Sequence, residues 1–218
     1  MLVDYTVEGR IARLTLNSPH NHNALSTALV EQLHQGFADA AAADVRAVVL
    51  GHTGPTFCAG ADLSEAAGRE PGDVAVDRAR EMTRLLRAIL ELPVPVIAAV
   101  DGNVRAGGMG MVGACDIAVA GPASSFALTE ARIGVAPSII SLTLLPKLTA
   151  RAAGRYFVTG EKFGAAEAAD IGLITVAADD VGATVAELAD RGAKVLLLSH
   201  FGRPKGAKDP RQSLSLVV

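Results

Sequence analysis

Apolar and polar residues alternate over two neighbouring stretches near the amino terminus. Residues 2–7 and 10–16 follow this two-residue period on either side of a Glu-Gly pair, which predicts a β-hairpin with one face towards solvent. Ser26 then stands at a helix N-cap position. The apolar residues that follow at the spacing of one helical face are Leu29, Leu33 and Phe37. The pattern therefore predicts a hairpin followed by an amphipathic helix.

The middle of the chain changes to continuous apolar runs. Residues 45–50 and 94–100 are rich in β-branched side chains and carry no polar alternation, which is typical of strands covered on both faces. Between them, residues 73–92 repeat apolar side chains at a helical period until Pro93 ends the pattern. Strand, helix and strand thus follow one another, as in a parallel sheet.

Shorter elements follow towards the carboxyl terminus. Residues 117–120 and 125–128 are strand-like, whereas three later segments have helical patterns separated by Gly and Pro. These helical segments are 139–148, 152–158 and 165–171. No repeat of solenoid period is present. We therefore expect an α/β layered fold with a largely parallel sheet.

Composition narrows the class of protein. The chain has 218 residues, half of them hydrophobic, and a net charge of −3 with acidic and basic residues interspersed. We therefore expect a globular protein without a nucleic-acid partner or a membrane partner, because neither a basic patch nor an apolar run of ~18 residues is present. Cys58 and Cys115 both lie in apolar sequence, which favours buried thiols in a reducing compartment. With no signal-peptide pattern at the start, we expect a cytoplasmic protein.

Two short glycine-containing stretches are the strongest candidates for chemistry. They are Phe57-Cys58-Ala59-Gly60-Ala61-Asp62-Leu63 and Ala106-Gly107-Gly108-Met109-Gly110. Each lies where a strand-like run gives way to a helical pattern, so each can present unpaired backbone N–H groups. Two such donors would form an oxyanion hole, which stabilises negative charge on a carbonyl oxygen. The alternative is that both stretches are only tight turns and helix starts.

A proton-transfer group would complete such a site. Glu130 stands at the end of a short apolar strand, where burial would raise its pKa towards neutrality. The alternative is a surface carboxylate paired with the neighbouring Arg132. The sequence around Glu130 leaves both interpretations open.

Several motifs together carry a resemblance to a known family. They are Asn23-Ala24-Leu25-Ser26, residues 57–63, Ala99-Val100-Asp101-Gly102, Gly107-Gly108, Cys115-Asp116-Ile117 and residues 126–134. In this order and spacing, residues 1 to about 182 resemble the enoyl-CoA hydratase/isomerase (crotonase) superfamily. The resemblance implies a spiral of ββα units, an acyl-CoA thioester substrate, and homo-oligomers that are trimers or hexamers. It implies no cofactor other than the coenzyme A of the substrate.

The resemblance also implies roles for individual residues. Ala61 and Gly107 would supply the N–H groups of the oxyanion hole, and Glu130 would be the catalytic acid/base. The residues implied to bind substrate, several of them along the path of coenzyme A, are Ala24, Ala59, Gly60, Asp62, Leu63, Gly108, Gly110 and Pro137.

Position 110 departs from the pattern of many hydratases in this family. They carry a second glutamate where this chain has Gly110, and that glutamate helps to hold the attacking water. A single carboxylate can also move a proton between two carbons, as an isomerase does. The sequence after Glu130 resembles branched-chain or glutaconyl-type enoyl-CoA hydratases. We therefore expect hydration with Glu130 alone, with isomerisation as the alternative.

Other interpretations of the same residues are weaker. The glycines at 108, 110 and 113 match a dinucleotide fingerprint, but an intervening segment separates them from the preceding strand. His20 and His22 lack further ligands at a recognised metal spacing, so we expect no metal site. No histidine is locally paired with Cys58, which we expect to be a small core residue.

The last part of the chain has a different character. Residues 188–216 resemble the N-domain of phosphoglycerate kinase, with a buried strand at 195–198 and a Gly/Pro-rich basic loop. By that resemblance, His200 and Arg203 would correspond to contacts with 3-phosphoglycerate, but no nucleotide site accompanies them. We interpret the chain as a chimera of a truncated crotonase-like domain, 1–182, and a kinase-like fragment, 183–218. A catalytically impaired acyl-CoA-binding protein is therefore a further alternative.

Overall fold

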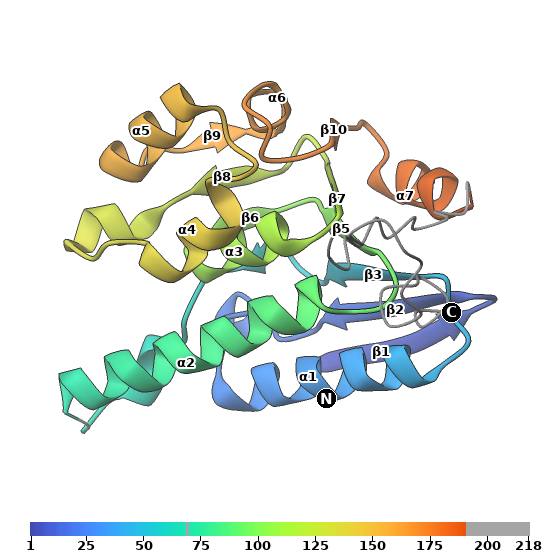
Figure 1. Ribbon diagram of the computed structural model, residues 1–218, viewed down its shortest axis with the longest axis horizontal. Helices are drawn as coiled ribbons and strands as arrows, with labels where there is room; N and C mark the ends of the chain where they lie inside the picture. Colours follow the sequence, from blue (N-terminus) through green and yellow to red (C-terminus); the bar gives the residue numbers. More distant parts are fainter. Residues whose placement is uncertain (69, 191–218) are drawn as a thin grey trace, which may run out of the picture.

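The computed structural model describes residues 1–68 and 70–190, which form two β-sheets surrounded by helices (Figure 1). The larger sheet has six strands in the order β1-β2-β3-β5-β7-β10, and the smaller sheet has four in the order β4-β6-β8-β9. The strands are β1 (Val3–Glu8), β2 (Ile11–Leu16), β3 (Ala47–His52), β4 (Thr56–Cys58), β5 (Val96–Val100), β6 (Asn103–Arg105), β7 (Ile117–Ala120), β8 (Ser125–Ala127), β9 (Phe163–Gly164) and β10 (Val176–Ala177). The kinase-like strand and loop expected at 192–206 lie outside the described residues.

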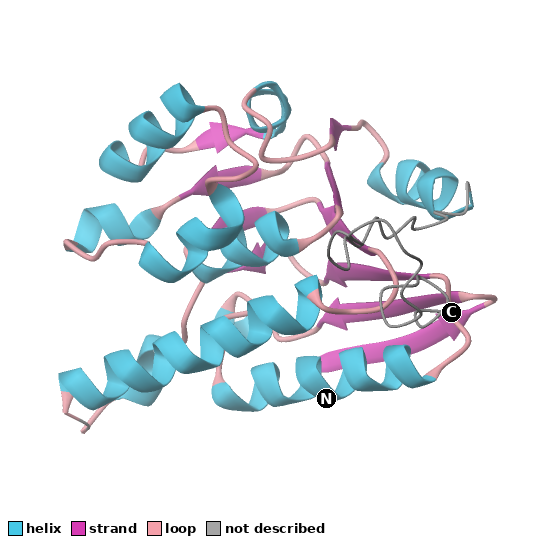
Figure 2. Ribbon diagram, in the orientation of Figure 1, coloured by secondary structure: helices cyan, strands magenta, loops and turns pink. Residues whose placement is uncertain are grey.

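Helices cover both faces of the larger sheet (Figure 2). The α-helices are α1 (Thr27–Ala42), α2 (Pro71–Leu90), α3 (Gly107–Ala114), α4 (Ser138–Leu144), α5 (Ala150–Thr159), α6 (Ala165–Asp170) and α7 (Val181–Asp190). Short 3₁₀ helices are η1 (Pro19–Asn21), η2 (Leu63–Ala66) and η3 (Thr129–Ile133). None of the described helices combines the length and hydrophobicity needed to cross a bilayer.

The hairpin, the first helix and the parallel sheet are confirmed. β1 pairs antiparallel with β2, and β2, β3, β5 and β7 pair parallel in turn. The Ser26 side chain accepts a hydrogen bond from the Leu29 N–H at the start of α1, as its N-cap position predicts. Along β3, Val48 and Leu50 pack on the side of α1, whereas Val49 faces α7. A strand buried on both faces in this way explains the continuous apolar runs.

The smaller sheet is only partly evident from the sequence pattern. The strand expected at 125–128 is confirmed as β8, whereas β4 and β6, with three residues each, are too short for a periodicity to emerge. The three strands pair parallel, β4 with β6 and β6 with β8. Phe126 on β8 is fully buried and stacks on Phe163, with ring centroids 5.7 Å apart. This contact anchors the sheet that carries the candidate site.

Helix α7 crosses the domain boundary expected at residues 182 and 183. Val185 and Ala189 are buried against the outer face of the larger sheet. At the end of the helix, Arg46 Nη2 lies 2.6 Å from Asp190 Oδ1. The described fold therefore continues through residue 190, and the position of the boundary stays a prediction.

Candidate active site

Three adjacent strands of the smaller sheet end at the same edge. Ala61 follows β4, Gly107 follows β6 and Glu130 follows β8, each after a short link. Because the three strands are parallel, their carboxyl ends lie side by side. Residues far apart in the sequence are thereby brought to one place.

The segment around Ala61 is held by backbone pairing with Leu25. The Leu25 N–H donates to the Gly60 carbonyl at 2.7 Å, and the Asp62 N–H donates to the Leu25 carbonyl at 3.2 Å. In such a parallel bridge, the residue between the two bonded groups directs its own N–H to the other side. Accordingly, the Ala61 N–H has no acceptor within residues 1–68 and 70–190.

Gly60 brings this segment into contact with the second loop. Its φ is +92°, in the left-handed region that favours glycine, and a Cβ there would lie 2.8 Å from the Ala106 Cβ. The same Cβ would lie 3.5 Å from the Gly107 nitrogen. A glycine is therefore required for the two loops to approach this closely.

Gly107 presents its N–H at the start of α3. The preceding residue, Ala106, has φ 47° and ψ −119°, a conformation that non-glycine residues rarely adopt. It is held there because its N–H donates to the Ala127 carbonyl at 3.3 Å and its carbonyl accepts from the Met109 N–H at 2.8 Å. As in the first turn of any helix, the Gly107 N–H lacks an intrahelical partner, and none of the described residues accepts from it.

Glu130 lies on η3 with its side chain largely buried. Its Oε2 is inaccessible to solvent and has no hydrogen-bond partner among the described residues. Burial raises the pKa of this carboxyl above its ordinary value. Arg132 is not its partner, because the Arg132 Nε donates to the Gly160 carbonyl at 3.1 Å. A paired surface carboxylate is therefore the wrong interpretation of Glu130.

A cavity of about 480 Å³ joins these groups, and we call it the central cavity. The expected site residues that line it are Ala59, Ala61, Leu63, Gly107, Glu130 and Pro137. Other parts of its wall come from Leu25, Arg78, Met82, Leu85, Ile139 and Ile140. The expected residues that are not part of its wall are Ala24, Gly60, Asp62, Gly108 and Gly110. The cavity thus combines mostly apolar walls with two unbonded N–H groups and the Glu130 carboxyl, while the second carboxylate of its lining, Glu81, is paired with Arg78.

The residues outside the wall have structural contacts of their own. Asp62 caps η2 by accepting from the Ser64 N–H at 3.0 Å, and Ala24 is buried. A Cβ at Gly108 would lie 2.8 Å from the Cys58 Cβ, so this glycine lets α3 approach β4. Burial raises the pKa of the Cys58 thiol to about 12, which makes it a poor nucleophile and fits the expected core role.

Gly110 on α3 packs directly against Ile140 of the neighbouring helix α4. A Cβ at Gly110 would lie 2.5 Å from Ile140 Cγ2 and 2.9 Å from Ile140 Cβ. The Thr143 hydroxyl donates to the Gly110 carbonyl at 3.0 Å, which holds α4 against α3. The space into which a longer side chain at 110 would extend is therefore occupied by Ile140. Close helix packing also explains Gly113, where a Cβ would lie 3.0 Å from Leu144 Cδ2.

The pattern of the sequence did not reveal Arg78, Met82, Ala106 or Ile140 as site residues. Met82 and Ile140 belong to apolar helical stripes and could not be told from core residues. Strain at Ala106 leaves no trace in the sequence, because it arises from the backbone conformation of that residue, with φ 47°, and not from the residue type. Only the spatial arrangement identifies these four.

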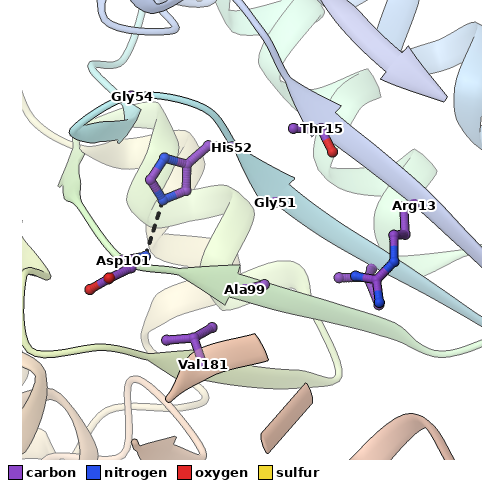
Figure 3. A pocket seen from close by; sticks show the side chains of 9 residues that line it. Arg13, Thr15, Gly51, His52, Gly54, Ala99, Asp101 and Val181 are labelled. Atoms are coloured by element: carbon purple, nitrogen blue, oxygen red, sulfur yellow. Dashed lines mark hydrogen bonds between the residues drawn. The ribbon is translucent and has the colours of Figure 1, made fainter. Parts of the chain in front are cut away.

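A separate cavity of about 400 Å³ lies on the outer face of the larger sheet (Figure 3). Its polar groups are largely engaged within the protein: His52 Nε2 accepts from the Asp101 N–H at 3.1 Å, and Arg13 pairs with Glu8 at 3.0 Å. In the part of the chain that the structure describes, no group of three or more His, Cys, Asp or Glu side chains could hold a metal ion. The candidate residues are all absent from this cavity, so we assign the site to the central cavity.

Known structures and sequences are similar to this chain over most of its length. An enoyl-CoA hydratase from Mycobacterium avium is 66% identical with a TM-score of 0.81, over 88% of this chain and 76% of that chain. An enoyl-CoA hydratase from Mycobacterium smegmatis is 32% identical with a TM-score of 0.84, over the same shares. Enoyl-CoA hydratase domain-containing protein 3 of Danio rerio, a mitochondrial protein by its name, is 32% identical over 169 residues, 77% of this chain.

The layered α/β fold of this chain is therefore that of solved enoyl-CoA hydratase structures. A sequence model described as Enoyl-CoA hydratase/isomerase matches residues 6–196, and the chain belongs to that family. The chain spans 58% of the length of the Danio rerio relative and 55% of the length of the rat protein of the same name.

Proposed function

We propose that this protein adds water to a 2-enoyl-CoA thioester. The observation that carries the proposal is the convergence on one cavity of the unbonded N–H groups of Ala61 and Gly107 and the unpartnered carboxyl of Glu130. Preorganised donors stabilise a developing oxyanion without having to reorganise during the reaction, and each is typically worth ~10²- to 10³-fold in rate. The family of the chain supports an acyl-CoA substrate.

In the proposed reaction, Glu130 moves one proton twice. Its carboxylate takes a proton from water as the water oxygen bonds to the β-carbon of the substrate. The carbonyl oxygen becomes negatively charged and accepts hydrogen bonds from Ala61 and Gly107. The Glu130 carboxyl then returns the proton to the α-carbon, which gives the 3-hydroxyacyl thioester. A pKa raised by burial favours the first of these transfers, because it makes the carboxylate a stronger base towards the water proton.

The walls of the cavity support an apolar acyl group. Met82 and Leu85 from α2 and Ile139 from the start of α4 offer hydrocarbon surface beyond the two N–H donors. Coenzyme A would pass Ala59 and Leu63, which line the cavity, and the reaction needs no further cofactor.

Isomerisation of a 3-enoyl-CoA is the second candidate reaction. Ile140 occupies the space beside Gly110, so no carboxylate stands there, and the other carboxylate of the cavity lining, Glu81, is paired with Arg78. One carboxylate is enough for this reaction. Glu130 would take a proton from the α-carbon and return it to the γ-carbon as the double bond moves.

The remaining candidate is a protein that binds acyl-CoA without efficient turnover. It follows from the interpretation of residues 183–218 as a foreign fragment, which is itself a prediction from the sequence. Exposed apolar residues Leu142 and Val158 on α4 and α5 also support self-association, for which a trimer or hexamer is proposed.

Turnover of a trans-2-enoyl-CoA and of a 3-enoyl-CoA, with product analysis, tests these candidates. Glu130→Gln should lower the rate by about 10²- to 10⁴-fold, the usual range for a general acid/base. Glu91→Gln is the matched control, because Glu91 is an exposed carboxylate that pairs with Arg87 at the end of α2.

Each outcome discriminates among the candidates. Equal rates for wild type and Glu130→Gln would contradict the role of Glu130. A 3-hydroxyacyl product identifies the hydratase, and conversion of only the 3-enoyl substrate identifies the isomerase. Acyl-CoA binding without either product would support the binding protein.

A further inference from the structure

Arg78 on α2 is a partly buried cation in the wall of the central cavity. Its side chain is 18% exposed, and its guanidinium contacts three groups at once. Nη1 donates to Glu81 Oε2 at 2.6 Å, and Nη2 bonds to the Glu65 carboxylate and donates to the Asp62 carbonyl at 3.4 Å. Glu81 lies on the same helix, so it fixes the guanidinium relative to α2.

Glu65 extends these contacts to the first helix. Its carboxylate accepts from the Thr27 N–H at 3.1 Å and from the Thr27 hydroxyl at 3.0 Å, at the start of α1. A carboxylate at a helix N-terminus is favourable because it satisfies unpaired N–H groups. Through Glu65, Arg78 therefore ties η2 to both α1 and α2.

These contacts enclose the backbone that carries the Ala61 N–H. On one side, Gly60 and Asp62 are bonded to Leu25, two residues before Thr27. On the other side, Arg78 contacts the Asp62 carbonyl directly and holds η2 through Glu65. Because the Ala61 N–H itself has no acceptor among the described residues, its direction depends on how firmly its neighbours are held.

We infer that Arg78 is a positioning residue that directs the Ala61 N–H into the central cavity. The inference rests on the proposed function, because it assigns Arg78 to the oxyanion site of that reaction. Two carboxylates already neutralise its charge, which disfavours a second role as a binding site for the phosphates of coenzyme A. Lysine is a poor replacement, since a single ammonium lacks the planar fork that reaches Glu65, Glu81 and Asp62 together.

The test compares Arg78→Met and Arg78→Lys with Arg87→Met. Arg87 is on the same helix and pairs with Glu91 at 2.8 Å, but its side chain is 67% exposed and remote from the cavity lining. The measurements are kcat and KM for the enoyl-CoA, thermal unfolding, and the absorption band of a bound cinnamoyl-CoA thioester. That band moves to longer wavelength when its carbonyl is polarised by hydrogen bonds.

We expect Arg78→Met to lower kcat by about 10- to 100-fold with KM changed by less than about threefold, since small misplacement of a catalytic donor costs up to ~10²-fold. The band shift should shrink in the same variant. Arg78→Lys should recover part of both effects, and Arg87→Met should match wild type in both.

Several results would overturn the inference. A raised KM with unchanged kcat would mean that Arg78 contacts the substrate instead. A full band shift in both Arg78 variants would mean that it does not orient the donor. If Arg78→Met does not fold, the folded Arg78→Lys variant decides alone by its band shift.

Different results would contradict the proposed function. Wild type that shifts the band but forms no 3-hydroxyacyl product would refute hydration, while the comparison of band shifts would still test Arg78. Wild type without any band shift would refute the oxyanion site and the inference with it.

Discussion

The two loops that face the central cavity present the same group by different means. Ala61 obtains its direction from ordinary β-pairing, because its two neighbours are bonded to Leu25. Gly107 obtains its direction from a helix start and from Ala106, which is held at φ 47°. The Ala61 loop has no backbone strain and depends on pairing with Leu25, which is distant in the sequence. The Gly107 loop depends on its own neighbour Ala106, whose backbone is strained.

This difference shows that a catalytic geometry does not require one kind of local structure. The strain at Ala106 is maintained by bonds to Ala127 and Met109, so the surrounding fold bears its cost. The pairing at Ala61 carries no such cost but needs the contacts of Leu25, Glu65 and Arg78. The Gly107 loop is therefore sensitive to changes in its own backbone, and the Ala61 loop is sensitive to changes in the residues that contact it.

Gly60→Ala should have the largest effect, because it forces the two loops apart. The added Cβ would lie 2.8 Å from the Ala106 Cβ, at a φ of +92°. We expect kcat to fall by about 10²-fold and unfolding free energy to fall by about 2–3 kcal/mol.

Gly9→Ala is the control for this change. Gly9 also has a positive φ, +61°, but a Cβ there meets nothing within 4 Å. It should lose about 1 kcal/mol of stability and keep its kcat. Steady-state kinetics and urea unfolding measure both variants. Equal losses of kcat would show that contact between the loops is unimportant.

Alanine-to-glycine substitution should raise the free energy of unfolding in one loop and lower it in the other. Ala106→Gly relieves backbone strain of about 1–3 kcal/mol. It also costs about 0.4–1 kcal/mol, because glycine raises the conformational entropy of the unfolded chain. The free energy of unfolding should therefore rise by about 1 kcal/mol. Ala61→Gly has no strain to relieve, since its φ is not positive, and should lose about 0.5–1 kcal/mol. Urea unfolding of both variants measures the difference. The same sign for both would contradict the distinction between a strained and a relaxed loop.

The smallest effect should be the pH dependence of stability that arises from the Glu130 carboxyl. Because burial raises the pKa of Glu130, the folded state favours its protonated form. Wild type therefore loses stability as pH rises from the ordinary glutamate pKa through the raised value, and Glu130→Gln does not. Thermal unfolding midpoints should agree near pH 4 and differ by about 2 °C in favour of Glu130→Gln near pH 8. A difference that is constant over this pH range would contradict the assignment to Glu130 ionisation.

Much of the larger sheet could be predicted from the sequence. Strands such as β3 are long and apolar enough to be distinguished, and the Ser26 cap marks the start of α1. Of the smaller sheet only β8 could be predicted, because β4 and β6 are defined by their pairing rather than by local pattern. This sheet is what brings Ala61, Gly107 and Glu130 together.

Motif resemblance identified the candidate site residues that local pattern alone left ambiguous. It could not identify Arg78, whose neighbours at Glu65 and Glu81 become neighbours only when η2 meets α2. Nor could it explain Gly110, because the reason for that glycine lies on α4. Both features depend on contacts between separate helices, which the sequence pattern does not show.

The packing of Ile140 against Gly110 has a consequence for the history of this protein. A glutamate introduced at 110 alone would collide with Ile140, and a smaller residue introduced at 140 alone would leave a void in the interior. Each single change is therefore expected to be unfavourable, so a carboxylate at 110 would require a compensating change at 140. The residues at these two positions are coupled across the contact between α3 and α4.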